Sequence, residues 1–348
     1  MSAELQAYGL PRADSAEAWK DLAKMDDMTA ASRTGSVTVP RLAVDRCAAA
    51  LKRGLLSFAV IATRQYFRCF PFRLGKELLW RRFAQAYLFW RRTPFRVRTE
   101  WGGLFECSGS DFIQRYILLF GVWEPCLTEL MINRLRAGDV FIDVGANVGY
   151  FSILAARLVG PTGSVVAIEA SPHICALLRR NIALNGLTNI RVVQQAVADR
   201  AGRMTIEPGP ADSLALTRTR WAAESPHVAT IPADTLQALV TREEWSAARM
   251  IKIDIEGGEV NVFPSLLEGV DRLRRDVEIV AELSVDALGD CGERARSLFS
   301  RFATAGFRPY AIENSYAYDS YFDRARPAAP RRLTEIPELQ TDVLFSRL

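Results

Sequence analysis

Two acidic residues, Asp143 and Glu169, are the most informative positions in the chain, because each directly follows a short apolar run (140–142 and 165–168). The residues at 145–149 are small and glycine-rich, and the apolar residues after them recur at helical spacing. This order predicts strand, tight turn, helix and strand, which is one βαβ unit. Such a unit places both strands in one parallel sheet, so both acids lie at its carboxyl edge, where open α/β sheets bind ligands. The pattern predicts a site for a nucleotide-type cofactor.

The composition of the turn selects among cofactors. The Gly-Lys-Ser/Thr ending of a Walker loop is absent, and Asn147 stands where the dinucleotide fingerprint has its second glycine. A carboxylate just before the glycines would repel a pyrophosphate but suits an ammonium group. S-adenosylmethionine carries an ammonium, a sulfonium and a ribose and no phosphate, and Glu169 is placed to accept hydrogen bonds from the ribose hydroxyls. An ordinary turn with a helix-capping Asn147 is the alternative. The expected cofactor is S-adenosylmethionine, and its expected ligands here are Asp143, Gly145, Ala146, Asn147, Gly149 and Glu169.

A second group of polar residues follows another strand pattern. Isoleucines at 251, 253 and 255 alternate with Lys252, Asp254 and Glu256, and glycines then start a new helix. If the acceptor is an alcohol, methyl transfer also removes a proton, and a carboxylate base is worth roughly 10²–10⁴-fold. Either Asp254 or Glu256 is the expected base, and the other is expected to hold a substrate hydroxyl. Lys252 lies on the same face of the strand and is their expected ion-pair partner. In the alternative, the two acids cap the following helix. A divalent cation would need further oxygen ligands, so no metal is expected.

Four motifs carry a resemblance to a known family: VFIDVGANVGYFS, VVAIEASP, LLRRNIALNGL and MIKIDIEGGE. Together they resemble the FkbM family of S-adenosylmethionine-dependent methyltransferases, over roughly residues 121–345. The resemblance implies a class I methyltransferase α/β fold, a Rossmann-like sandwich with a mainly parallel seven-stranded sheet flanked by helices. It also implies O-methylation of a hydroxyl on a carbohydrate or secondary metabolite. In that fold Gln195 and Ala196 would line the adenine slot, and Glu124 is either a contact of the methionine ammonium or a helix N-terminal acid.

The residues before this domain form a separate region. The expected division is an N-terminal helix and linker (1–40), a basic and aromatic region (41–120) and the methyltransferase domain (121–348). Residues 64–98 contain ten Lys or Arg, one acid and many aromatic residues. They predict either peripheral contact with anionic lipid or an acidic glycan, or a helical extension whose aromatic residues pack on the core.

Composition narrows the class of protein further. The net charge of +4 over 348 residues does not indicate a nucleic-acid binder, and the two histidines do not indicate a His-based nucleophile or metal site. The six cysteines show no metal-like spacing and fit a reducing compartment, and no signal peptide is visible, so a cytoplasmic location, with possible peripheral membrane contact, is expected.

The leading hypothesis is therefore a methyltransferase that acts on a small-molecule or glycan hydroxyl. An NAD-dependent oxidoreductase is the enzymatic alternative, but the glycine spacing and a hydride-relay residue are missing. A non-catalytic protein on the same fold, which binds membranes or partners through its N-terminal region, is the third hypothesis. Intact Asp143 and Glu169 argue against it. The acceptor and the oligomeric state are not predicted.

Overall fold

The computed structural model describes residues 39–70, 72–90, 94–207, 209, 213–214, 217–221, 230–255, 258–283, 293–322, 327–337 and 340–347. Expectations for residues 1–38 and for Glu256 lie outside these ranges. The chain divides into two compact units, Met1–Glu77 with Ser315–Arg324, and Leu78–Asn314 with Ala325–Leu348. The domain boundaries expected near residues 40 and 120 stay a prediction.

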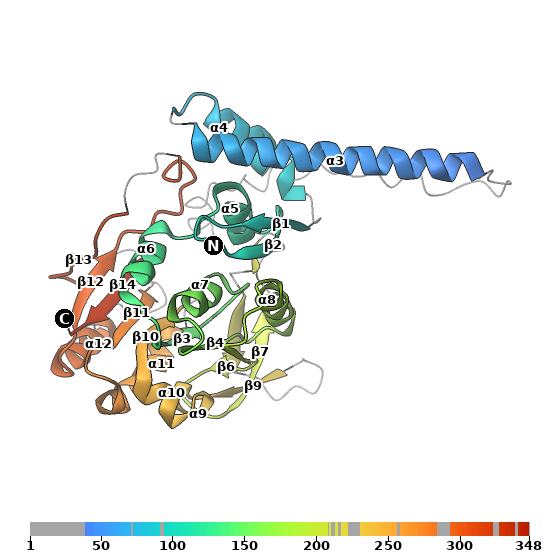
Figure 1. Ribbon diagram of the computed structural model, residues 1–348. Coiled ribbons are helices and arrows are strands. Elements are labelled where there is room, and N and C mark those ends of the chain that lie inside the picture. The colour runs from blue at the N-terminus through green and yellow to red at the C-terminus, as the bar shows by residue number, and fades with distance from the viewer. Residues whose placement is uncertain are drawn as a thin grey trace. The chain divides into compact units, whose positions relative to one another are not determined.

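The second unit is built around one eight-stranded sheet (Figure 1). Its strands, in spatial order, are β13 (Arg331–Arg332), β12 (Arg308–Ile312), β14 (Thr341–Ser346), β11 (Glu278–Leu283), β10 (Ala248–Ile253), β3 (Val140–Val144), β4 (Ser164–Ile168) and β5 (Ile190–Val193). The strands from β5 to β11 are parallel, and β14 runs antiparallel between β11 and β12. Apart from the two-residue β13, this is the predicted seven-stranded class I methyltransferase fold.

Helices cover both faces of the sheet. They are α5 (Phe112–Phe120), α6 (Pro125–Arg134), α7 (Tyr150–Val159), α8 (Pro172–Leu184), α9 (Leu236–Leu239), α10 (Arg242–Ala247), α11 (Glu259–Glu268), the short η5 (Val270–Arg272) and α12 (Glu293–Thr304). Figure 1 shows α6, α7 and α8 on one side of the sheet and α9 to α12 on the other.

The strand period decides which side chains face the site. Ile142 and Val144 of β3 pack in one apolar cluster with residues of α9 to α12. Because side chains alternate along a strand, Asp143 projects to the opposite face, where α7 lies. The same alternation in β10 sends Ile251 and Ile253 into the apolar cluster and Lys252 toward α7. The polar positions of both strands therefore meet on one face.

Smaller sheets flank the main one. A hairpin of β1 (Pro94–Arg98) and β2 (Leu104–Ser108) precedes α5, and a four-stranded sheet follows β5. Its strands are β6 (Ala196–Val197), β9 (Thr230–Asp234), β7 (Gly202–Glu207) and β8 (Arg218–Trp221). The sequence pattern predicts a strand that continues to Ala196, and this is wrong. The main sheet's strand ends at Val193, and Ala196 pairs with Ala233 in the second sheet.

The first unit is dominated by α3, a helix of 31 residues (Val39–Cys69). Pro40 occupies its first turn, where proline is tolerated. After the helix, the side chain of Lys76, at the start of α4 (Lys76–Leu79), is buried and donates to the carbonyl oxygens of Phe67 and Phe322 at 3.1 and 3.4 Å. The rings of Phe67 and Phe322 lie 5.1 Å apart. These contacts fix the end of α3 against residues 315–322.

Some aromatic residues of 64–98 are buried, as expected for packed side chains, and others are exposed, as expected for contact with a lipid or glycan. Phe67 and Trp80 are 1% exposed, whereas Phe72 and Tyr87 are 65% and 41% exposed. The remaining turns of this segment are η2 (Trp80–Gln85) and η3 (Leu88–Trp90). Within the described residues, no helix combines the length and apolar character needed to cross a bilayer.

Candidate active site

The turn after β3 is held tightly against the neighbouring strands. The backbone N–H groups of Gly145 and Ala146 both donate to the carbonyl oxygen of Ile168, at 2.9 and 3.0 Å. Gly145 has a φ of +83°, and a Cβ at this position would collide with the carbonyl oxygen of Asp254. The ends of β3, β4 and β10 therefore converge at one point, and only glycine fits there.

Asn147 and Glu169 join the turn to the loop after β4. Asn147 adopts the left-handed conformation (φ 49°), and its side-chain oxygen accepts the N–H of Val148 at 2.7 Å. The N-cap of α7 is Gly149, so Asn147 closes the turn and does not cap the helix. The Glu169 carboxylate accepts the N–H groups of Asn147 and Ser171 at 3.0 and 2.8 Å. One carboxylate thus fixes both loops.

Glu169 is nearly excluded from solvent, with 8% of its surface exposed. Burial raises its pKa to about 7, against the opposing effect of the two backbone N–H donors. Each carboxylate oxygen has room for a further hydrogen bond, because an ionised carboxylate accepts about four. The group is therefore able to accept ligand hydroxyls while it holds the loops.

Asp143 carries the clearest mark of a binding function. Its Oδ2 accepts the Ser152 hydroxyl of α7 at 2.5 Å. Its Oδ1 is buried and receives no hydrogen bond from the described residues, although the whole residue is only 1% exposed. Burial raises its pKa, and the charge of Lys252 opposes this effect. A buried carboxylate oxygen without a donor is costly unless a ligand supplies one.

Lys252 is the cation at the centre of the site. It pairs in register with Asp143 on the adjacent strand, and its Nζ donates to Asp254 Oδ2 at 2.7 Å. The Nζ also lies 5.1 Å from the ring centroid of Phe151. Burial alone would lower the pKa of Lys252, but Asp254, Asp143 and Glu124 raise it above its usual range. The predicted ion pair between Lys252 and Asp254 is confirmed.

Two further acids belong to this group: Glu124, which was expected to be either a contact of the methionine ammonium or a helix N-terminal acid, and Asp342, which was not predicted. Glu124, the N-cap of α6, is 4% exposed and left-handed (φ 41°), and burial followed by the charge of Asp342 raises its pKa well above the usual range. Asp342 of β14 accepts the side-chain amide of Asn314 at 2.6 Å, and burial raises its pKa to about 6. The charges of Lys252 and Asp254 act on both acids.

Residues 341–345 resemble the last strand of the FkbM family, which indicates a strand but not its direction. In the structure this strand, β14, runs antiparallel between β11 and β12. A residue at its amino end therefore lies at the carboxyl edge of β10 and β11. For Glu124, the proline that follows it predicts the start of a helix, but it does not predict that the Glu124 side chain is buried.

The remaining predicted residues have less defined positions. Gln195 is half-buried in the connection between β5 and β6, and Ala196 packs in the small core of the second sheet with Ala233. Asp254 is half-buried directly after β10, and its backbone N–H donates to Val144 at 3.0 Å. It does not cap α11, whose N-cap is Gly258 without a side-chain hydrogen bond. Glu256 lies outside the described residues.

These residues fit the predicted cofactor. The donorless Asp143 oxygen suits an ammonium group, and the buried Glu169 suits hydroxyl donors. The turn offers no Lys or Arg for a phosphate. Among the described residues, no three His, Cys, Asp or Glu side chains are grouped as a metal site would require.

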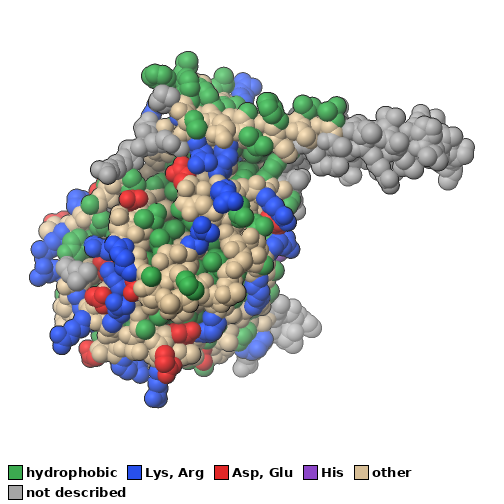
Figure 2. Space-filling model, in the orientation of Figure 1, with side chains coloured by type: hydrophobic (Ala, Val, Ile, Leu, Met, Phe, Trp, Pro, Cys, Tyr) green, Lys and Arg blue, Asp and Glu red, His purple; other side chains and the backbone are tan. Residues whose placement is uncertain are grey.

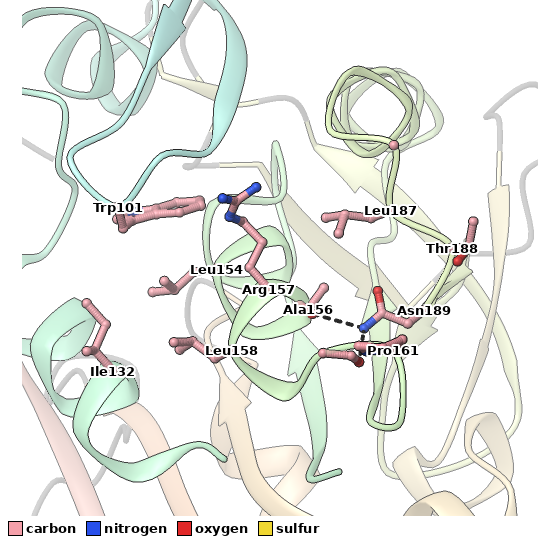
Figure 3. Close-up of a pocket in the computed structure, with 12 residues that line it drawn as sticks. Trp101, Ile132, Leu154, Ala156, Arg157, Leu158, Pro161, Leu187, Thr188 and Asn189 are labelled. Carbon is pink, nitrogen blue, oxygen red and sulfur yellow. Dashed lines mark hydrogen bonds between the residues drawn. The ribbon is translucent and has the colours of Figure 1, made fainter. Parts of the chain in front are cut away.

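A cavity of about 630 Å³ lies at the other end of α7 (Figure 3). The side chains of Trp101, Leu154 and Leu187 line it, with Arg157 as its charged group. Asn189 at its edge donates to the carbonyl oxygens of Ala156 and Gly160. None of the predicted site residues lines this cavity. It is separate from the turn after β3.

The order and directions of the strands are those of the class I methyltransferase fold. Residues 143–309 match the methyltransferase FkbM domain. A relative from Streptomyces tacrolimicus, 31-O-demethyl-FK506 methyltransferase FkbM, is 47% identical over 77 residues, or 22% of this chain and 29% of its own. Protein-L-isoaspartate O-methyltransferase 1 of Archaeoglobus fulgidus is 32% identical over 96 residues, or 27% of this chain and 42% of its own.

Among solved structures, an S-adenosylmethionine-dependent O-methyltransferase from Thermotoga maritima aligns with a TM-score of 0.37 at 13% identity, over 73% of this chain and 77% of that one. This chain spans less than half the length of the two curated relatives above. The match to the methyltransferase FkbM domain covers residues 143–309, which is just under half of this chain.

Proposed function

We propose that this protein transfers the methyl group of S-adenosylmethionine to a hydroxyl of a carbohydrate or secondary metabolite. The observation that carries the cofactor half of the proposal is the buried Asp143 oxygen without a hydrogen-bond donor. The family match supports the reaction class. The hydroxyl acceptor rests on the family resemblance and on the carboxylates beside Lys252.

In this proposal each residue at the carboxyl edge of the main sheet has one role. Asp143 binds the ammonium group, and Glu169 accepts the ribose hydroxyls. The turn residues Gly145, Ala146, Asn147 and Gly149 provide the close backbone surface between them. Gln195 and Ala196 line the adenine end. No metal is required.

The acceptor end uses the acids beyond β10. When bound, S-adenosylmethionine supplies an electrophilic methyl group, and the protein must hold the acceptor oxygen in line with it. Asp254 or Glu256 removes the hydroxyl proton, and the other positions the acceptor. The hydrogen bond from Lys252 Nζ to Asp254 Oδ2 at 2.7 Å holds the Asp254 carboxylate in place and supports Asp254 for that role. Glu124 and Asp342 are added here as groups able to hold further acceptor hydroxyls.

The partner is therefore a small molecule or glycan and not a nucleic acid. A reducing compartment such as the cytoplasm is also part of the proposal. It is supported by the free thiols of Cys69, Cys107, Cys126 and Cys175 among the described residues.

Calorimetric titration with S-adenosylmethionine and, separately, NADH tests the cofactor. We expect micromolar binding of S-adenosylmethionine and none of NADH. Radiolabelled methyl transfer to a panel of glycans and hydroxylated metabolites then tests the acceptor. Asp254→Asn should lower kcat by about 10²–10⁴-fold and leave cofactor binding within a few fold, as expected for a base. Binding of NADH in place of S-adenosylmethionine would refute the proposal.

A further inference from the structure

Among the described side chains of α3, which begin at Leu51, apolar residues lie on two sides of the helix, one buried and the other exposed. Val60 and Phe67 on one side are 2% and 1% exposed. On the other side, Leu51, Leu55, Phe58 and Ile61 are 66%, 61%, 71% and 57% exposed. Their spacing of three and four residues aligns them along one stripe of the helix. Figure 2 shows hydrophobic side chains along an edge of this helix. Large apolar side chains grouped in this way mark an interaction surface.

The residues after the helix add further apolar surface to the same unit. Phe70, Phe72 and Leu74 are 36%, 65% and 78% exposed. The Phe70 ring lies 4.8 Å from that of Tyr66 and 5.5 Å from that of Phe72. The Tyr66 hydroxyl donates to the carbonyl oxygen of Leu74. The exposed aromatic residues are therefore ordered by contacts with the end of α3. Together with the four residues of α3, we call them the apolar stripe.

The charge of this segment identifies its partner. Residues 39–77 contain eight Lys or Arg and two acids. A second copy would bring the same excess of positive charge, which repels. An acidic glycan would match the charge but would leave the apolar stripe in water. An anionic lipid bilayer provides both negative headgroups and an apolar layer.

We propose that the apolar stripe of α3 and residues 70–74 lies in the surface of an anionic membrane. The helix lies parallel to the bilayer and does not cross it, because no described helix is long and apolar enough to span a bilayer. Leu55, Phe58 and Phe72 enter the headgroup boundary, and the exposed Arg73 contacts lipid phosphates. This inference is independent of the methyl-transfer reaction.

Vesicle co-sedimentation of the full chain tests the proposal. We expect binding to phosphatidylcholine vesicles that contain phosphatidylglycerol, weak binding to phosphatidylcholine alone, and weakening by high salt. The double variant Leu55→Gln and Phe58→Gln should lower partitioning by about 10- to 100-fold, because two large apolar side chains no longer enter the bilayer. The matched control is Leu78→Gln with Tyr87→Gln, which removes two side chains of 63% and 41% exposure outside the stripe.

Circular dichroism and light scattering complete the test. Both double variants should keep the helix content of the parent chain and bind S-adenosylmethionine equally. Binding to anionic vesicles that is unchanged in Leu55→Gln with Phe58→Gln would overturn the proposal. A dimer of the parent chain that this variant converts to a monomer would also overturn it, because the stripe would then cover a second copy.

Discussion

The ammonium group of Lys252 lies 2.7 Å from Asp254 Oδ2, while the same residue pairs in register with Asp143 on the next strand. The buried cation Lys252 thus lies between Asp143, which is expected at the methionine end of the cofactor, and Asp254, which is expected at the acceptor. Two more acids, Glu124 and Asp342, act on it electrostatically. A ligand that carries positive charge lowers the raised pKa values of these carboxyl groups, so its binding is favoured at this edge.

Asp143→Asn should weaken S-adenosylmethionine binding by about 10- to 100-fold. The substitution keeps the shape of the side chain but removes a charge-assisted hydrogen bond to the ammonium group, worth about 1.5–3 kcal/mol. Calorimetry measures the Kd. The control is Asp139→Asn before the amino end of β3, where the carboxylate binds Arg274 at 2.9 Å. An unchanged Kd in Asp143→Asn would remove this residue from the cofactor site.

Lys252→Met should lower the free energy of unfolding by about 3–5 kcal/mol, because Asp143 and Asp254 lose a buried cation. The charge of Lys252 lowers the pKa of Asp143, which therefore rises in the variant, so the loss is largest at neutral pH and shrinks as the pH falls and Asp143 gains a proton. Urea unfolding at several pH values measures this. The double variant Lys252→Met with Asp254→Asn should recover part of the loss. Equal losses in both variants would show that the pair is not coupled.

Glu169 should make stability depend on pH. Its folded pKa is about 7, above the ordinary value of 4.5, so the folded state binds the proton more tightly. Its contribution to stability is therefore greatest at low pH and falls between about pH 4.5 and 7. Relative to Glu169→Gln, the parent chain should lose about 3 kcal/mol between pH 4.5 and 8. The exposed Glu129→Gln corrects for general effects. A pH-independent difference would contradict the assignment.

Gly145→Ala should disrupt the site more than an ordinary glycine substitution. The new Cβ would collide with the Asp254 carbonyl oxygen, so the ends of β3 and β10 must separate. Gly186→Ala is the control, since Gly186 also has a positive φ (63°) but has no atom within 4 Å of the new Cβ. The control should cost about 1–2 kcal/mol from backbone strain alone. Gly145→Ala should cost more and also weaken cofactor binding; equal effects would show that the contact is not tight.

The class I sheet was implied by the resemblance to the FkbM family. Local pattern was enough to predict the βαβ unit and the pairing of Lys252 with Asp254. Each of these depends on strand period or on contacts within a short stretch of chain. Asp342 could not be predicted in this way, since a reversed strand brings it to the site from 88 residues beyond Asp254. Ala196 shows the other limit. One strand was expected from Ile190 to Ala196, but Ala196 pairs with Ala233 and belongs to another sheet.

The position of β14 also has a consequence for how the chain is made. This strand lies between β11 and β12, although it follows both in the sequence. During synthesis, the edges of β11 and β12 that pair with β14 remain unpaired until residues 341–346 have left the ribosome. Exposed edges of this kind promote aggregation. We therefore expect yield in a host cell to depend on chaperones that hold the nascent chain until this strand closes the sheet.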